Sequence, residues 1–335
     1  MIIRPMVRPS ALQKYTYRYL STADKYFVPD NEKILKSNAP IMKRVDAYLR
    51  LARFDKQIGT KLLLLPCFWS ISLAAVPGAL PSLYTMSLFT VGALSARSAG
   101  CAINDYWDLD IDKSVERTKY RPVTTGEITK VKALGFFGAL TGTCFAIAYS
   151  LPPLVTSIGL LCVPLVVAYP RFKRFFKYPQ GMLGVTFNMG VFMGYAAIKN
   201  VINLKVLGPL YIGSILWTIV YDTIYAFQDI SYDKKIGLKS CAIEFEKNPK
   251  LILGSLAALS TGCMGLAGYL AGLHPIYYMF LAGAASHYSW QISTLDIKNV
   301  DRCKNMFLSN QYLGILILFG FIMGRYYQQP KEKEE

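Results

Sequence analysis

Two clusters of acidic side chains are the residues of this sequence whose types and spacing could support chemistry. The first cluster, N-D-Y-W-D-L-D-I-D, occupies residues 104–112. On a helix, Asn104, Asp108 and Asp112 recur at i, i+4 and i+8 and share one face, and Asp105 flanks that face. Carboxylates that share a face repel each other unless a cation lies between them. The spacing therefore predicts a site for a cation.

The second acidic cluster, Y-D-T-I-Y-A-F-Q-D-I-S-Y-D-K-K, occupies residues 221–235. On a helix, steps of three and four residues place four of these side chains on one face: Asp222, Tyr225, Asp229 and Asp233. Both clusters offer oxygen ligands without His or Cys. Such ligands suit Mg²⁺, which takes one or two carboxylates and completes its shell with phosphate oxygens. The alternative, ordinary acids at solvated helix ends, is weaker because both clusters adjoin apolar segments, where acids are costly and usually functional.

Basic residues follow both acidic clusters. They are Lys113, Arg117 and Arg121 after the first, and Lys234 and Lys235 after the second. Arginine and lysine beside Mg²⁺ are the groups that a bound diphosphate requires. The sequence has no G-x-x-x-x-G-K-[ST] loop, so a nucleoside triphosphate is not expected.

Arg97 lies inside an apolar segment, in L-S-A-R-S-A-G-C. A cation near the middle of a membrane helix costs about 2.5–3.5 kcal/mol on insertion scales, so a buried anionic partner is expected. Arg97 lies two helical turns before Asn104, which places it deeper than the first acidic cluster and close to the same helix face. Its partner is either a neighbouring aspartate in a structural ion pair or a substrate anion, a carboxylate or the diphosphate itself.

Apolar segments must position these side chains, and about nine of them have near-spanning length. They lie near 57–76, 82–102, 133–150, 152–169, 181–198, 206–226, 251–271, 275–294 and 309–325. Hydrophobic residues make up 53% of the chain and charged residues 17%, an apolar excess too large for one soluble core. The same composition excludes a disordered chain. The sequence therefore predicts an all-α, multi-span transmembrane bundle.

The loops between the apolar segments alternate in charge. Basic loops lie at 103–132, 170–180, 227–250 and 295–308; the loops at 77–81, 150–152 and 272–274 carry no Lys or Arg, and 199–205 carries two Lys. Positively charged loops stay on the inner side of a membrane. The alternation supports an odd number of spans, with the N-terminus and both acidic clusters on one side. In a mitochondrion that side would be the matrix.

The N-terminal segment 1–23 contains no acid, four basic residues and several hydroxyl side chains. This is the composition of an organelle transit peptide, and no apolar run of a secretory signal is present. A basic cytosolic tail is the alternative. Residues 24–42 resemble a polar linker, and 43–56 are expected to form an interfacial amphipathic helix. The remainder, 43–335, is predicted to be a single membrane domain.

The net charge of +16 would suggest nucleic-acid binding in a soluble protein. In a membrane protein, basic loops that face anionic lipid explain the same charge, so nucleic acid is not an expected partner. The chain has seven cysteines without a C-x-x-C pair, and two histidines. No disulfide framework or zinc site is therefore predicted.

Together these motifs resemble the UbiA superfamily of intramembrane aromatic prenyltransferases. The family's first motif, N-D-x-x-D-x-x-x-D, is matched by Asn104, Asp105, Asp108 and Asp112. Its second motif, D-x-x-Y-x-x-x-D, is matched by Asp222, Tyr225 and Asp229, with Asp233 four residues further on. A Y-P-x-x-K-R motif is matched by Tyr169, Pro170, Lys173 and Arg174. Shorter motifs are matched by residues 179–184 (P-Q-x-x-L-G), 290–292 (W-Q-I) and 307–310 (F-x-S-N). The resemblance covers about 45–325.

Two extensions of the first motif are most similar to the subfamily that prenylates 4-hydroxybenzoate in ubiquinone synthesis. They are R-S-A-G-C-x-I-N-D at 97–105 and E-R-T-K-Y-R-P at 116–122. One departure from the family pattern is Gln57, where relatives usually have proline. We expect a small change at the start of the first helix and no loss of activity.

The resemblance implies nine spans around a central cavity, with motif loops capping one face and Mg²⁺ holding a polyprenyl diphosphate. The implied metal ligands are Asn104, Asp108, Asp112, Asp222 and Asp229. The implied substrate-binding cations are Lys113, Arg117, Arg121, Lys173 and Arg174, with Arg53 and Lys56 at the start of the first helix. The implied catalytic residues are Tyr169 and Tyr225 near the allylic carbon, with Asp105, Asp112 and Asp233. Since these cations serve the diphosphate, Arg97 is expected to hold the substrate carboxylate.

The resemblance further implies transfer of a polyprenyl group to the ring carbon ortho to the hydroxyl of 4-hydroxybenzoate. The expected location is the mitochondrial inner membrane, with the site facing the matrix, in the lipid bilayer and beside other quinone-synthesis proteins. One alternative is a sibling enzyme with another acceptor, as in haem farnesylation or another quinone or tocopherol. The other is a transporter, whose site would lie near mid-membrane at broken helices rather than at same-side helix ends.

Overall fold

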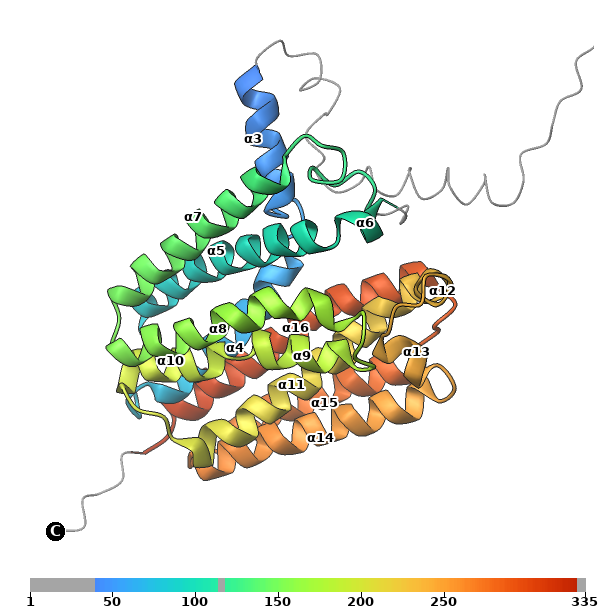
Figure 1. The fold of residues 1–335 in the computed structure, drawn as a ribbon. Coiled ribbons are helices and arrows are strands. Elements are labelled where there is room, and N and C mark those ends of the chain that lie inside the picture. The colour runs from blue at the N-terminus through green and yellow to red at the C-terminus, as the bar shows by residue number, and fades with distance from the viewer. Residues whose placement is uncertain (1–39, 114–117, 330–335) are drawn as a thin grey trace, which may run out of the picture.

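The computed structural model describes residues 40–113 and 118–329, and these fold into helices without a β-strand (Figure 1). The helices are α3 (Pro40–Leu51), α4 (Ile58–Ala74), α5 (Leu83–Trp107), α6 (Leu109–Asp112), α7 (Lys130–Tyr149), α8 (Pro153–Phe172), α9 (Pro179–Phe187), α10 (Gly190–Lys199), α11 (Leu204–Ala226), α12 (Ile230–Lys235), α13 (Cys241–Phe245), α14 (Pro249–Leu270), α15 (Ile276–Thr294) and α16 (Val300–Tyr326), with the 3₁₀ turn η1 (Phe227–Asp229) before α12. The all-α prediction is confirmed.

Seven helical segments of the described chain are long and apolar enough to cross a membrane. They are α5, α7, α8, α9 with α10, α11 with its continuation to Lys235, α14 and α16. The two other expected spans are also helical: α4 is apolar but shorter, and α15 is not among the seven because tyrosines, serines and His287 reduce its hydropathy. Each predicted apolar segment therefore corresponds to a helix or a helix pair.

Capping side chains and prolines fix where several helices begin. The hydroxyls of Ser82 and Thr129 accept hydrogen bonds from the backbone N–H groups of Thr85 and Lys132 at the starts of α5 and α7. α8, α9 and α14 begin with proline, whose fixed φ suits the first turn. At Gln57, where a proline was expected, the side-chain amide donates to the carbonyl of Phe54 at 2.9 Å and α4 begins directly afterwards.

Aromatic residues fill the centre of the bundle, where α4, α11 and α16 meet. The rings of Trp69 and Trp217 lie 5.0 Å apart. The Trp69 indole donates to the carbonyl of Gly314 at 2.9 Å, and the Trp217 indole donates to Oδ1 of the buried Asn310 at 3.0 Å. A side chain at Gly314 would collide with Leu65, so a glycine is required for this close approach.

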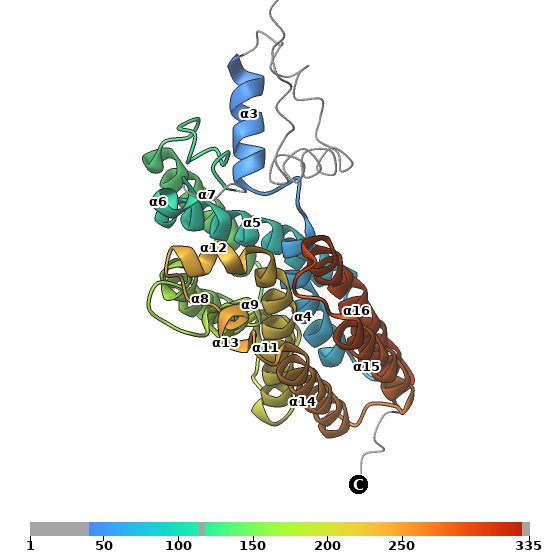
Figure 2. The same ribbon diagram turned by 90° about the vertical axis from the view of Figure 1, so that its right-hand side faces the viewer.

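The two ends of the bundle differ in the way the charge alternation predicts. α6 and α12, which belong to the two acidic motifs, lie at one end together with α13, and α16 finishes at the other (Figures 1 and 2). At that second end, Arg325 donates to the carbonyl of Ala75 at 2.6 Å, and the His274 N–H donates to the carbonyl of Gly324. The uncharged loops at 77–81 and 272–274 therefore lie opposite the acidic motifs.

Some predictions lie outside the described residues. The proposed transit peptide, 1–23, lies there in full, and the linker, 24–42, does so up to residue 39, where the structure begins with α3. Arg117 also lies outside the described residues. These assignments stay predictions.

Candidate active site

The first acidic motif lies at a break between two helices. A continuous helix was expected over 104–112, but α5 ends at Trp107 and α6 begins at Leu109. Asp108, between them, has φ −95° and ψ 6°, in the sparsely populated bridge region. Hydrogen bonds from the Asp108 N–H to the Asn104 carbonyl (2.9 Å) and from the Asp112 N–H to the Asp108 carbonyl (2.8 Å) continue across the break. The helical register of the three residues is therefore preserved.

The second acidic motif contains a break of the same kind. α11 ends at Ala226, η1 follows, and α12 begins at Ile230. Asp229, at the junction, has φ −109° and ψ 4°, nearly the conformation of Asp108. Interrupted helices with short 3₁₀ stretches often mark functional positions. Both motifs thus present an aspartate at the point where a membrane helix is interrupted.

Two arginines hold the fully buried carboxylate of Asp105. Arg53 Nη2 donates to both carboxylate oxygens, at 2.8 and 3.0 Å. Arg121 Nη1 donates to Asp105 Oδ1 at 3.0 Å and to Asp112 Oδ2 at 2.7 Å. Charge-assisted hydrogen bonds of this kind fix both partners firmly. Asp105 therefore orients two cations beside the motif.

The backbone at Arg53 is unusual, because a non-glycine residue there has φ 56°. This left-handed conformation costs energy in most residues and persists where the surroundings determine it. Here Arg53 Nη1 donates to the carbonyl of Arg50 at 2.9 Å, in addition to the bonds with Asp105. The bend after α3 thus directs Arg53 into the acidic motif.

Asp108 is buried between two basic residues of the 170–180 loop. Lys173 Nζ lies 2.5 Å from Asp108 Oδ2, and Arg174 Nη2 lies 4.0 Å from Asp108 Oδ1. Arg174 also donates to the carbonyl of Trp107 at 2.8 Å. Asp108 Oδ1 has no hydrogen-bond donor among the described residues. A buried carboxylate oxygen without a hydrogen-bond donor is suited to bind a metal ion or a donor group of a ligand.

The first motif is not a closed metal cage. No group of three or more His, Cys, Asp or Glu residues gathers as a metal site in the described part of the chain. Mg²⁺ uses few carboxylates and takes further oxygens from substrate, so its binding does not require such a cage. At Asp112, burial raises the pKa of the carboxyl group, although the neighbouring Arg121 acts in the opposite direction.

Arg97 lies deeper in the bundle, on α5. Its guanidinium carbon lies 5.8 Å from the centre of the Phe187 ring, and Nε is buried without a hydrogen-bond partner among residues 40–113 and 118–329. The guanidinium also lies against Gly59 on α4, where a Cβ would come within 2.4 Å of Nε. No ion pair within 4.0 Å joins Arg97 to Asp222, although both are described and interact electrostatically. The alternative of a structural ion pair with this aspartate is therefore not supported.

Tyr169 lies within electrostatic range of both motifs and of Arg97. Its electrostatic neighbours are Asp108 in the first motif, Asp222 in the second, and Arg97. Tyr225 is a further neighbour of Arg97, and its ring packs on Phe307 at 4.5 Å. Side chains from α5, α8 and α11 therefore converge, although they are far apart in sequence.

The remaining predicted residues lie in different surroundings. Asn104, Asp229 and Asp233 are half-buried, whereas Lys56 and Lys113 are exposed. Three contacts around the site involve residues that the sequence motifs do not assign: the Thr118 hydroxyl donates to the Asp112 carbonyl (3.1 Å), the Lys239 N–H donates to the Lys173 carbonyl (3.0 Å), and Gln180 accepts from the Cys241 N–H (2.9 Å). The P-Q-x-x-L-G match at 179–184 was the one available signal for Gln180.

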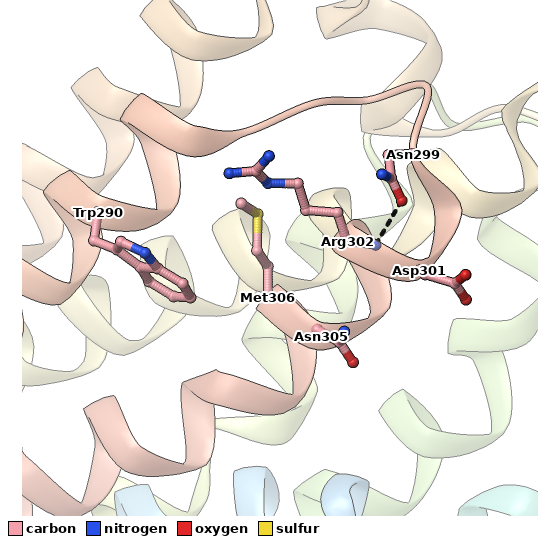
Figure 3. Close-up of a pocket in the computed structure, with 6 residues that line it drawn as sticks. All are labelled: Trp290, Asn299, Asp301, Arg302, Asn305 and Met306. Carbon is pink, nitrogen blue, oxygen red and sulfur yellow. Dashed lines mark hydrogen bonds between the residues drawn. The ribbon is translucent and has the colours of Figure 1, made fainter. Parts of the chain in front are cut away.

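A pocket of about 360 Å³ lies between two helices of the bundle (Figure 3). It is lined by Trp290, Asn299, Asp301, Arg302, Asn305 and Met306, at the junction of α15 and α16. Asn299 Oδ1 accepts a hydrogen bond from the Arg302 N–H at 3.0 Å, which caps α16. No residue of either acidic motif lines this pocket.

Comparison with known proteins identifies the family of the chain. Residues 63–321 match the model of the UbiA prenyltransferase family. The chain belongs to this family. Similar curated proteins include the mitochondrial 4-hydroxybenzoate polyprenyltransferases of Arabidopsis thaliana and Caenorhabditis elegans. The Arabidopsis thaliana protein is 44% identical, and the match covers 85% of this chain and 70% of that protein. The Caenorhabditis elegans protein is 39% identical, and the match covers 93% of this chain and 88% of that protein.

Solved structures of UbiA homologues share the fold. The apo structure of a homologue from Aeropyrum pernix K1 has a TM-score of 0.67 and 25% identity, covering 78% of this chain and 96% of that protein. A homologue from Archaeoglobus fulgidus, bound to GPP and Mg²⁺, has a TM-score of 0.65 and 18% identity, covering 83% and 99%. The UbiA fold is thus shared across low sequence identity.

Proposed function

We propose that the protein transfers a polyprenyl group from a polyprenyl diphosphate to 4-hydroxybenzoate, as a step of ubiquinone synthesis. The acceptor atom is the ring carbon ortho to the hydroxyl, and diphosphate is released. The observation that carries the proposal is the convergence of both acidic motifs and Arg97 around Tyr169. Carboxylates and cations at the end of the bundle suit a diphosphate, and one deeper guanidinium suits a carboxylate. The names of the similar curated proteins support the same activity.

The proposed cofactor is Mg²⁺. Its ligands would be Asn104, Asp108 and Asp112 for one ion, and Asp222 and Asp229 for a second. Asp108 fits this role because its buried Oδ1 has no donor among the described residues. When bound, Mg²⁺ would neutralise charge on the diphosphate as the allylic C–O bond breaks.

Basic side chains that surround the first motif would hold the diphosphate. Lys173 and Arg174, which flank Asp108, and Arg121 would donate hydrogen bonds to phosphate oxygens. Asp105 accepts three hydrogen bonds from Arg53 and Arg121, so we assign it a positioning role. Lys56, Lys113 and Arg117 stay candidates from the sequence, as does Asp233 in the second motif.

The acceptor would lie deeper, between Arg97 and the two tyrosines. The Arg97 guanidinium would grip the carboxylate of 4-hydroxybenzoate and direct the ortho carbon toward the allylic carbon. The faces of Tyr169 and Tyr225 would stabilise positive charge on the allylic fragment and exclude water. The new C–C bond forms as the diphosphate leaves with the electrons of the C–O bond, and the ring then loses its proton.

We further propose that the protein lies in the mitochondrial inner membrane, with the acidic motifs on the matrix side. The acid-free 1–23 segment, the basic loops and the names of the relatives support this location. Cysteine substitutions in the 227–250 loop should be protected from an impermeant thiol reagent in intact mitoplasts. Labelling of that loop from the intermembrane side would contradict the orientation.

The activity is tested by incubating the purified full chain with Mg²⁺, 4-hydroxybenzoate and a set of prenyl diphosphates. Mass spectrometry should detect prenylated 4-hydroxybenzoate. Consumption of a different aromatic acceptor would support the sibling enzyme instead. Product formation in detergent, where no gradient exists, would exclude a requirement for transport.

A further inference from the structure

Helix α3 has two apolar sides, and the bundle covers only one of them. The covered side, Ala47 and Leu51, packs on a cluster formed by Ala102, Val123, Ile128 and Ala133. The Tyr48 ring lies 5.0 Å from that of Phe136 on α7. The other side is formed by Ile41, Met42, Val45 and Leu49, which are 72%, 56%, 52% and 46% exposed. We call these four residues the outer face of α3.

α3 lies across the direction of the spans and projects past the side of the bundle (Figures 1 and 2). It lies at the end that carries α6 and the start of α7. Val131 and Leu134 are also exposed near the start of α7. In a membrane, the outer face would thus lie over the lipid beside the bundle, at the level of the headgroups.

A basic side chain beside the outer face suits an anionic membrane surface. Arg44 is exposed on the same short helix. A helix with an apolar stripe and flanking basic residues binds in the plane of the interface. Four side chains on three turns fall well short of the about 800 Å² per partner that a stable protein interface buries. Lipid is therefore a better match than a second copy of the chain or another protein.

α3 is connected to the first acidic motif through Arg53, which follows it in the chain. Arg50 lies 2.7 Å from Asp46 and also pairs with Glu127 in the loop before α7. The carbonyl of Arg50 accepts from Arg53, and Arg53 in turn holds Asp105. The position of α3 therefore determines where the strained backbone at Arg53 places its guanidinium.

We propose that the outer face of α3 binds the anionic lipid surface, and that this contact holds Arg53 on Asp105. Membrane attachment then positions a cation of the candidate active site. The lipid contact itself does not depend on the proposed function, whereas its effect on turnover does.

The lipid contact is tested by photo-crosslinking of the full chain in nanodiscs of phosphatidylcholine with phosphatidylglycerol. Val45→benzoylphenylalanine places the probe on the outer face, and Lys43→benzoylphenylalanine is the matched control on the opposite side of the helix. We expect about tenfold more lipid adduct at position 45 than at 43, because the two positions face opposite directions. Equal lipid-adduct yields at positions 43 and 45 would overturn the proposal. So would a crosslinked dimer through position 45, or a crosslink from position 45 to another protein in mitochondrial membranes.

The positioning role is tested with a double-mutant cycle. Ile41→Ser with Val45→Ser should reduce turnover about threefold to tenfold, whereas Lys43→Ser should leave it unchanged. In an Arg53→Ala background the two serine substitutions should have no further effect, because coupled residues are not additive. Unchanged turnover, or an additive loss, would overturn the positioning role. If the wild-type chain forms no product, the proposed function fails, and the crosslinking result still decides the lipid contact.

Discussion

Substituting Gly59→Ala tests the role of Arg97 without removing the arginine. The added Cβ would lie 2.4 Å from Arg97 Nε, 2.9 Å from Nη2 and 3.0 Å from Cζ. Ordinary van der Waals contact begins at 3.4 Å, so the guanidinium must move by about 1.0 Å to restore it. The atoms in conflict belong to a flexible side chain, and alanine favours a helix over glycine, so the fold should be retained.

A displacement of about 1 Å in a positioning group reduces catalytic efficiency up to about 10²-fold. We therefore expect Gly59→Ala to raise the KM for 4-hydroxybenzoate by about tenfold or more and to leave the KM for the prenyl diphosphate nearly unchanged. Steady-state assays with each substrate varied separately measure both constants. Gly135→Ala on α7 is the control, since its Cβ meets nothing within 4 Å. A rise confined to the prenyl diphosphate KM would refute the assignment of Arg97 to the carboxylate.

Three further predictions concern single side chains. Asp108→Ala or Asp229→Ala should each reduce kcat about 10²–10³-fold at matched protein level, because each removes a group that stabilises the leaving diphosphate; near-normal turnover would contradict the two-metal arrangement. Arg97→Lys keeps the charge but loses the planar fork, so it should raise the KM for 4-hydroxybenzoate far more than that for the prenyl diphosphate. The hydrogen bond from Arg50 lowers the pKa of Glu127 below 4.5, so its stabilisation is present above about pH 4.5 and is lost as pH falls through the lowered pKa. This partly exposed pair contributes about 0.2–1 kcal/mol, and thermal unfolding of Glu127→Gln should lack that pH dependence.

The positions of the helices and of both acidic motifs could be predicted because they depend on local sequence. Apolar length determines a membrane helix, and the alternation of loop charge determines which loops share an end. The helix breaks at Asp108 and Asp229 could not be predicted from spacing. Spacing predicts a helical face, whereas a break depends on what the chain contacts after it, such as Thr118 at the Asp112 carbonyl.

The pairing of Asp105 could not be predicted either. Its partners Arg53 and Arg121 are 52 and 16 residues away, and only the fold brings them together. The left-handed backbone conformation at Arg53 could not be predicted, because the residue there is not a glycine. Gly59 likewise gave no signal, because its role depends on Arg97 of the neighbouring helix.

The central claim is carbon–carbon bond formation at the position ortho to the hydroxyl of 4-hydroxybenzoate. It is tested most directly with 4-hydroxybenzoate carrying deuterium at both ortho positions, incubated with the purified protein, Mg²⁺ and a polyprenyl diphosphate. We expect a prenylated product that has lost one of its two deuterium atoms, with an equal amount of diphosphate released. A product that keeps both deuterium atoms, or the absence of any prenylated 4-hydroxybenzoate, would contradict it.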